Sequence, residues 1–279
     1  LAQPFEPELT LKWLNKIFQP LKDTLPELIR GINNSKKYHW DLSPESQQNL
    51  CSKLLDELGR DKDLVVVGKS PHPFSITLGP NDYRITTRIV EGEPLSSFLA
   101  TAHEWGHSIY EQGLPSQSHQ WFAWPLGQAT SMGIHESQSL FWENRIVKSK
   151  SFSKRFFKKF VSAGCTLNNY FELWKSINHL EAGLNRVEAD ELTYGLHILV
   201  RTELEIDLIE GGLPAEDIPE EWNKRYGELL GIKPSNDSEG CLQDVHWSEG
   251  AFGYFPSYLL GHLISCLLYT SPSPRDNSG

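Results

Sequence analysis

The sequence contains few cysteines and no close cysteine pair. Only four occur among 279 residues, at Cys51, Cys165, Cys241 and Cys266. This number and this spacing exclude a dense disulfide framework, so the chain is expected to be reduced and cytoplasmic.

Long apolar runs are also missing. The longest candidate, residues 258–269, is interrupted by Gly261 and His262. It therefore falls short of the roughly 18 apolar residues that a membrane-spanning helix needs. The N-terminal stretch lacks the basic, apolar and small-residue regions of a signal peptide. From these features we expect no membrane partner.

Basic residues are fewer than acidic residues in this sequence. Lysine and arginine together number 26 against 36 acidic residues, which gives a formal net charge of −10. This balance disfavours nucleic acid or an anionic membrane as a partner. Hydrophobic residues make up 39% and charged residues 22%, as in an ordinary soluble protein with enough length for a buried core.

Most of the chain has helical periodicity, and one short region has the residue composition that is typical of strands. The strands are expected at 64–67, 74–78 and 83–89, with turn residues between the last two. We predict a mainly α fold with a small antiparallel β-sheet. The predicted helices cover about 9–21, 44–58, 95–112, 136–150, 152–163, 167–177, 187–210, 219–230 and 255–268.

The last eleven residues, 269–279, differ in composition from the predicted helix that precedes them. They are polar and rich in serine and proline. Such a composition is typical of a disordered tail or of an unrelated appended segment. The folded part of the chain is therefore predicted to be 1–268.

The strongest chemical signal is an H-E-x-x-H motif formed by His103, Glu104 and His107. Positions i and i+4 share one face of a helix, so both imidazoles can point at one metal ion. Glu104 can then reach a water at that ion and act as the general base. Gly106, inside the motif, costs about 1 kcal/mol relative to alanine in a helix, which indicates a close approach by another segment.

A catalytic zinc site needs a third protein ligand and one open position. Glu136 is the best candidate, because it begins a predicted helix about thirty residues after His103. His135 is its rival in the same segment. Weaker candidates further along the chain are Glu188, Asp190 and Glu191.

Six ordered signatures together resemble the carboxypeptidase Taq family of zinc metallocarboxypeptidases. One is the zinc helix at 103–107. The others are H-P-F at 72–74, D-x-R-x-T at 82–86, H-E-S-Q at 135–138, R-x-x-A-D at 186–190 and G-x-x-Q-D-x-H-W at 240–247. One departure is Asn185, where the family usually has isoleucine or valine.

The resemblance implies a helical zinc peptidase with a long substrate groove. It implies one Zn²⁺ per chain, held by His103, His107 and Glu136, with Glu104 as the catalytic base; Co²⁺ or Mn²⁺ are possible substitutes. It also implies release of single residues from peptide C-termini with broad specificity, by a homodimer. Family members are longer, so 1–268 is expected to be a catalytic domain without its N- and C-terminal flanks.

A carboxypeptidase has to recognise the free C-terminal carboxylate of its substrate. An arginine is the natural partner, because its guanidinium can bind a carboxylate through two hydrogen bonds. Arg186 and Arg84 are the candidates, since each lies inside a family signature. The alternative for either is a structural salt bridge, such as one between Arg186 and Asp190.

His246 and Tyr254 are candidate substrate-binding residues, able to donate hydrogen bonds to a developing oxyanion. Tyr258 is a further possible donor. The alternative is that they belong to a buried aromatic cluster. Two alternative functions also stay open: an oligopeptidase with the same zinc helix, and an inactive metal-binding fragment.

Overall fold

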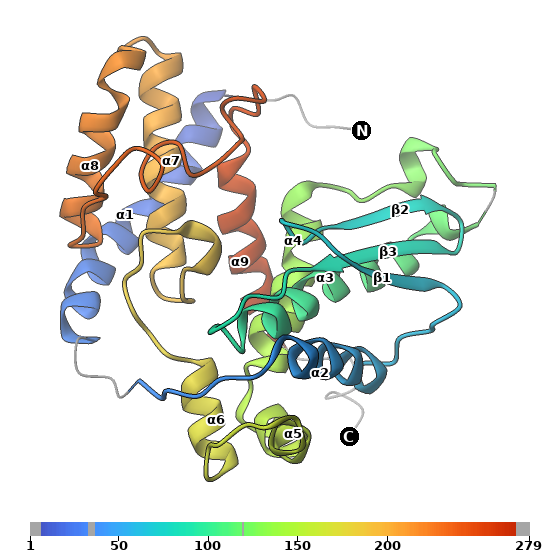
Figure 1. Cartoon of the computed structure of the whole chain (residues 1–279). Coiled ribbons are helices and arrows are strands. Elements are labelled where there is room, and N and C mark those ends of the chain that lie inside the picture. The colour runs from blue at the N-terminus through green and yellow to red at the C-terminus, as the bar shows by residue number, and fades with distance from the viewer. Residues whose placement is uncertain (1–6, 33–36, 119, 272–279) are drawn as a thin grey trace. The chain divides into compact units, whose positions relative to one another are not determined.

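The computed structural model describes residues 7–32, 37–118 and 120–271. Helices dominate the described part, as the sequence predicts, and they accompany one small sheet (Figure 1). The main helices are α1 (Pro7–Ile32), α2 (Pro44–Glu57), α3 (Ser96–Gln112), α4 (Met132–Leu140), α5 (Lys150–Ala163), α6 (Tyr170–Ile177), α7 (Tyr194–Ile209), α8 (Ile218–Leu229) and α9 (Phe255–Thr270). The strands are β1 (Val65–Lys69), β2 (Ser75–Gly79) and β3 (Asp82–Thr87).

The chain divides into two compact units. The first, which we call the helical unit, contains Leu1–Lys36 and His179–Leu259. The second, which we call the sheet unit, contains Lys37–Asn178 and Leu260–Gly279. The H-E-x-x-H helix, α3, belongs to the sheet unit.

The small sheet has the strand order β1-β3-β2 and is mixed. The short turn after Gly79, with Asn81 at φ 64°, makes β2 and β3 antiparallel, as predicted. β1 instead pairs in parallel with β3, so the sheet is not wholly antiparallel. The difference arises because the chain leaves β1 and returns as β2 on the far side of β3, a crossing that the strand periodicity does not reveal.

One face of the sheet packs on α3. Tyr83 and Ile85 alternate with less buried residues along β3, and both are buried. They form a core cluster with Val65 of β1, Leu55 of α2 and Trp105 of α3. The hydrophobic alternation of β3 therefore fixes the sheet against the helix that carries the metal-binding motif.

Aromatic packing holds the N-terminal part of α3. Phe98 lies 4.9 Å from Phe160 and 5.5 Å from Phe156, measured between ring centroids. Both partners belong to α5, and all three rings are buried. These contacts, together with that of Trp105, hold the side chains of the motif in fixed positions.

α4 begins earlier than predicted, because Ser131 caps it by accepting a hydrogen bond from the backbone N–H of Ile134. It crosses α3 closely at Gly106. A methyl group on Gly106 would lie 2.5 Å from Cα of Ser139 and 2.6 Å from the carbonyl oxygen of Gln138. The close approach expected from a glycine inside the motif is therefore confirmed, and the neighbour is α4.

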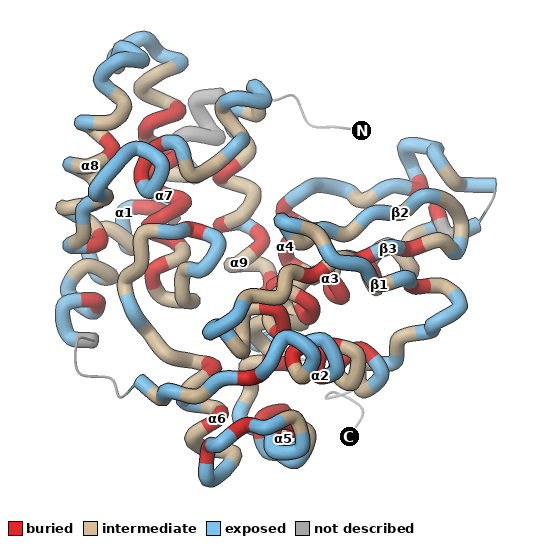
Figure 2. The backbone as a smooth tube through the Cα atoms, viewed as in Figure 1, coloured by how far each residue is buried: buried red, intermediate tan, exposed pale blue. Residues whose placement is uncertain are grey.

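In the helical unit, α7 is the most buried helix, which Figure 2 shows as a largely buried stretch. The predicted helix 187–210 is wrong at its start, since α7 begins only at Tyr194. The carboxylate of Asp190 accepts hydrogen bonds from the backbone N–H groups of Leu192 and Thr193. This local turn replaces the first helical turns, because aspartate competes well for free backbone donors.

α9 extends to Thr270, so Tyr269 and Thr270 of the predicted tail are helical. Residues 272–279 of that tail lie outside the described residues. Among the helices that the structure describes, none combines the length and the apolar character required to cross a membrane.

Candidate metal centre

Three of the predicted ligands lie together in the sheet unit. His103 and His107 project from α3 and Glu136 from α4, and one donor atom of each lies within 4.8 Å of the others. Oε2 of Glu136 is 3.4 Å from Nε2 of His107 and 3.7 Å from Nε2 of His103. A tetrahedral ion with bonds of about 2.0–2.1 Å places its ligand atoms roughly 3.3 Å apart. The two imidazoles and the carboxylate therefore fit a zinc-sized ion.

His135 contacts the predicted ligand His107 at Nδ1, the ring nitrogen that is not the one near Glu136. Its Nδ1 lies 2.6 Å from Nδ1 of His107, and its Nε2 lies 2.8 Å from Oε1 of Glu111. Because the carboxylate of Glu111 accepts a hydrogen bond from Nε2–H of His135, Nδ1 of His135 is left to accept a hydrogen bond from Nδ1–H of His107. This chain directs the lone pair on Nε2 of His107 toward Glu136, as metal-binding imidazoles require.

His103 has a similar support. Its Nδ1 lies 3.0 Å from Oε2 of Glu143, and the other carboxylate oxygen of Glu143 pairs with Lys148 at 2.9 Å. Glu143 belongs to a π-helical segment, Phe141–Val147, that continues α4. The sequence pattern assigns no role to Glu143 or Glu111, and it offers Asp190 as a weaker candidate ligand. Asp190 belongs to the helical unit, where it caps the turn described above.

The charges of this cluster favour a cation. Burial opposes protonation of His103, but Glu136 and Glu143 outweigh it and raise the pKa of His103 to about 10. Burial lowers the pKa of His107, so its imidazole is neutral. Burial would raise the pKa of Glu136, yet His103 and His107 hold it below its usual value. The proton on His103 thus supplies positive charge to the cluster. A divalent cation would replace this proton on binding.

Glu104 is buried beside the cluster, with 7% of its surface exposed. Burial raises the pKa of its carboxyl to about 7, with Glu136 and Glu143 adding to the effect and His103 opposing it. A carboxyl with a pKa near neutrality is suited to taking and returning a proton. Its chain position next to His103 agrees with the role predicted from the motif.

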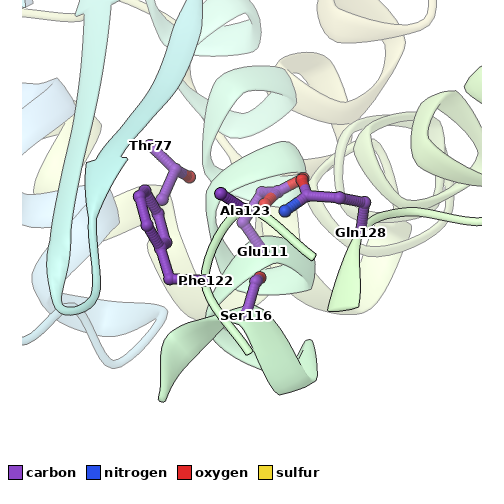
Figure 3. Close-up of a pocket in the computed structure, with 6 residues that line it drawn as sticks. All are labelled: Thr77, Glu111, Ser116, Phe122, Ala123 and Gln128. Carbon is purple, nitrogen blue, oxygen red and sulfur yellow. The ribbon is translucent and has the colours of Figure 1, made fainter. Parts of the chain in front are cut away.

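A cavity of about 310 Å³ is lined in part by Glu111, whose carboxylate also contacts His135. Its lining combines polar side chains with one aromatic ring, as Figure 3 shows: Thr77, Glu111, Ser116, Phe122, Ala123 and Gln128. Glu111 therefore has two neighbours, the cavity and His135. The cavity adjoins the support of His107 and contains none of the three predicted ligands.

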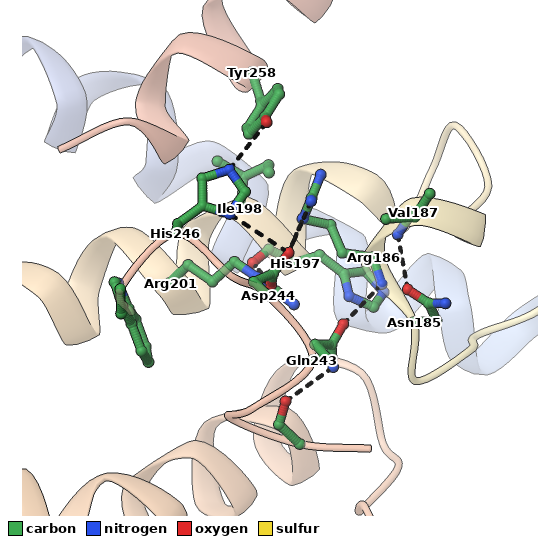
Figure 4. Close-up of polar contacts among 12 residues, drawn as sticks. Asn185, Arg186, Val187, His197, Ile198, Arg201, Gln243, Asp244, His246 and Tyr258 are labelled. Atoms are coloured by element: carbon green, nitrogen blue, oxygen red, sulfur yellow. Dashed lines mark hydrogen bonds and ion pairs between the residues drawn. The ribbon is translucent and has the colours of Figure 1, made fainter. Parts of the chain in front are cut away.

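Arg186 belongs to the helical unit and is buried there in an ionic network (Figure 4). Its Nε and Nη2 donate to Oδ1 of Asp244 at 2.9 and 2.7 Å. Arg201 donates to the other carboxylate oxygen of Asp244 at 2.5 Å. The alternative partner considered from the sequence, Asp190, is thus replaced by Asp244. The hydrogen bonds of Arg186 to Asp244 do not use its Nη1.

His246 and Tyr254 also belong to the helical unit, in a cluster of aromatic rings. Nε2 of His246 lies 3.1 Å from the hydroxyl of Tyr258. The His246 ring lies 5.3 Å from Tyr254 and 4.5 Å from Phe255. Arg84, the last predicted substrate-binding residue, is on β3 in the sheet unit and forms an exposed pair with Asp82 at 3.0 Å.

His197 makes the stability of the helical unit dependent on pH. Its ring is fully buried, and its Nδ1 lies 3.0 Å from the hydroxyl of Tyr226. Burial and the charges of Arg201 and Arg186, opposed by Asp244, lower the pKa of His197 to about 3. The unfolded chain binds a proton near pH 6.5, and the folded chain does not until far lower pH.

Acidification should therefore favour unfolding through His197. The unfolding free energy should fall by about 1.5 kcal/mol between pH 6.5 and pH 5, because only the unfolded state gains the proton in this window. Urea titrations of wild type and His197→Gln at several pH values measure this contribution of His197 to the unfolding free energy. The variant should show a shallower slope, and equal slopes in the two proteins would contradict the assignment.

The fold and the donor set define a helical metallopeptidase-type centre, and comparison with known proteins identifies its family. The family model described as carboxypeptidase Taq (M32) metallopeptidase matches residues 1–277. The chain belongs to this family.

Relatives of known sequence agree with this assignment. Thermostable carboxypeptidase 1 of Thermus thermophilus is 41% identical over 279 residues, which cover 96% of this chain and 54% of the relative. Carboxypeptidase 1 of Bacillus subtilis is 40% identical over 280 residues, covering 96% and 55%. The chain therefore spans about half the length of these curated relatives.

Solved structures show the same fold. Metallocarboxypeptidase 1 of Trypanosoma cruzi superposes with a TM-score of 0.85 at 36% identity, covering 95% of this chain and 56% of that one. A Pyrococcus furiosus carboxypeptidase gives a TM-score of 0.82 at 34% identity, covering 91% and 53%. The fold class predicted from the sequence is confirmed.

Proposed function

We propose that this chain carries the catalytic centre of a zinc metallocarboxypeptidase that releases single residues from peptide C-termini with broad specificity. The observation that carries the proposal is the convergence of His103, His107 and Glu136, with Glu104 buried beside them. The names of the relatives support the same reaction. Zinc is favoured because two imidazoles and one carboxylate are a common ligand set of catalytic zinc.

The bound zinc would supply Lewis acidity, which polarises the scissile carbonyl and makes a water acidic at neutral pH. Glu104 would take the proton from the attacking water and pass it to the leaving amine. His135 and Glu143 would hold the imidazoles of His107 and His103 in the orientation that binding requires.

For the substrate carboxylate, we favour Arg186 over Arg84. The Arg186 guanidinium is buried and held rigidly by Asp244, and its Nη1 is not used in that pair. Arg84 is exposed and already bound through Nε and Nη2 to Asp82. A fixed donor loses less conformational freedom when it binds an anion.

His246 and Tyr254 are proposed to donate hydrogen bonds to substrate oxygens. Both belong to the same unit as Arg186, and His246 is close to the Asp244 carboxylate that Arg186 binds, with an Nδ1–Oδ1 distance of 3.9 Å. The proposed substrates are peptides with a free C-terminal carboxylate. The homodimer implied by the family resemblance is also proposed, and the molar mass by light scattering tests it.

A pair of peptides tests the register of cleavage. The first has a free C-terminus, and the second has the same sequence with a C-terminal amide. Timed mass spectrometry should show loss of one residue after another from the free acid, while the amide stays intact. Internal cleavage of both peptides would favour the oligopeptidase alternative. Zinc binding without any cleavage would favour an inactive metal-binding fragment.

A further inference from the structure

Gly261 of α9 lies directly against the proposed third ligand. This glycine is one of the two residues that interrupt the apolar run 258–269. A methyl group on Gly261 would lie 2.7 Å from both Cβ and Cγ of Glu136, and 3.2 Å from its carbonyl carbon. Both residues belong to the sheet unit, and both are buried.

The contact involves the part of Glu136 that cannot move independently of its carboxylate. A flexible side-chain end could turn away from an added methyl group, but Cβ and Cγ lie between the backbone and the carboxylate. Any accommodation therefore rotates Glu136 or separates α9 from α4. Either change shifts Oε2 of Glu136 from its distances of 3.4 Å to His107 and 3.7 Å to His103.

α4 thus makes two close contacts that only glycine permits. Gly106 of α3 meets its backbone at Gln138 and Ser139, and Gly261 of α9 meets it at Glu136. The first contact brings α4 close to the two histidines. The second contact places α9 against the side chain of Glu136, so Glu136 cannot move away from the two histidines toward α9.

We propose that Gly261 is a positioning residue for the metal centre: its missing side chain sets the place of the Glu136 carboxylate between His103 and His107. The inference rests on the proposed role of Glu136 as a metal ligand. It makes α9 part of the metal centre, although α9 contributes no ligand of its own.

The test is the zinc affinity of Gly261→Ala, measured with zinc alone against a chromophoric chelator. The dissociation constant should rise about 10–100-fold, the range seen when residues that orient metal ligands are lost. Gly195→Ala is the matched control, because Gly195 also lies in a helix. A methyl group there would meet Leu21 and Leu259 at the ordinary contact distances of 3.5 and 3.7 Å. Its zinc affinity should equal that of wild type.

Thermal unfolding separates positioning from general packing. A positioning role predicts that Gly261→Ala loses most of the increase in melting temperature that zinc gives to wild type, while the metal-free melting temperature changes little. An unchanged zinc dissociation constant overturns the proposal. So does a metal-free melting temperature that falls as much as the zinc-bound one.

If Gly261→Ala does not fold, the double variant Gly261→Ala/Glu136→Gly should fold, because it removes Cβ and Cγ of Glu136, the two atoms closest to the methyl group. Failure of the double variant to fold overturns the proposal. Peptidase activity is not used in this test. A wild-type chain that binds zinc but cleaves no peptide therefore contradicts the proposed function, while the affinity ratio still decides the role of Gly261. A wild-type chain that binds no zinc contradicts both.

Discussion

Replacing Glu104 with glutamine should leave zinc bound and lower the turnover of a free-acid peptide by about 10²–10⁴-fold, the usual contribution of a general base. The substitution keeps the size of the side chain and its buried position beside His103. It removes the carboxylate that we propose takes the proton from the attacking water. The measurement is kcat by mass spectrometry, together with metal content on the same sample.

The matched control for this experiment is Glu93→Gln, which makes the same chemical change at an exposed position of the sheet unit. It should retain wild-type turnover and metal content. Turnover by Glu104→Gln within a factor of a few of wild type would remove Glu104 from the role of base. Loss of zinc from that variant would show instead that Glu104 contributes to the metal site.

Replacing Glu136 with alanine should strip the chain of zinc. The variant loses one of three ligands and leaves two imidazoles, of which His103 would then be held mainly by Glu143. After dialysis against buffer, metal analysis should find wild type near one zinc per chain and Glu136→Ala far below it. Peptide cleavage should be lost with the metal.

His135→Ala is the informative partner of that variant, because His135 is the rival ligand and the adjacent residue. As a support of His107, it should weaken zinc affinity by about 10–100-fold while a saturating zinc concentration still fills the site. A full zinc content in Glu136→Ala, combined with an empty site in His135→Ala, would transfer the ligand role to His135.

The sequence could predict that His103 and His107 lie together, because helical periodicity brings positions i and i+4 onto one face. Glu111 follows the same rule, since it lies four residues after His107 on α3, so its place beside the site could have been inferred. Glu143 could not be placed in this way. It reaches His103 from a π-helical segment whose geometry is not encoded in an ordinary helical repeat.

Helical periodicity also could not predict polar contacts between residues that are far apart in the sequence. From the sequence, Arg186 had Asp190 within one helical turn as a partner, but α7 starts later and Asp244 takes that place. For a glutamate within the predicted helix 187–210, such as Glu205, an exposed position is the ordinary expectation. Glu205 is buried instead, and it accepts hydrogen bonds from Trp247 and from the backbone of Gly253. Such pairs depend on which segments meet in the folded chain, which spacing along the sequence does not determine.

Dependence of C-terminal cleavage on zinc is the property that follows most directly from the proposed metal centre. The chain is freed of metal by a chelator, and zinc is then added back stepwise while loss of the C-terminal residue from a free-acid peptide is followed by mass spectrometry. We expect no cleavage without metal and full recovery at about one zinc per chain. Cleavage that persists at the same rate in the metal-free chain would contradict this expectation.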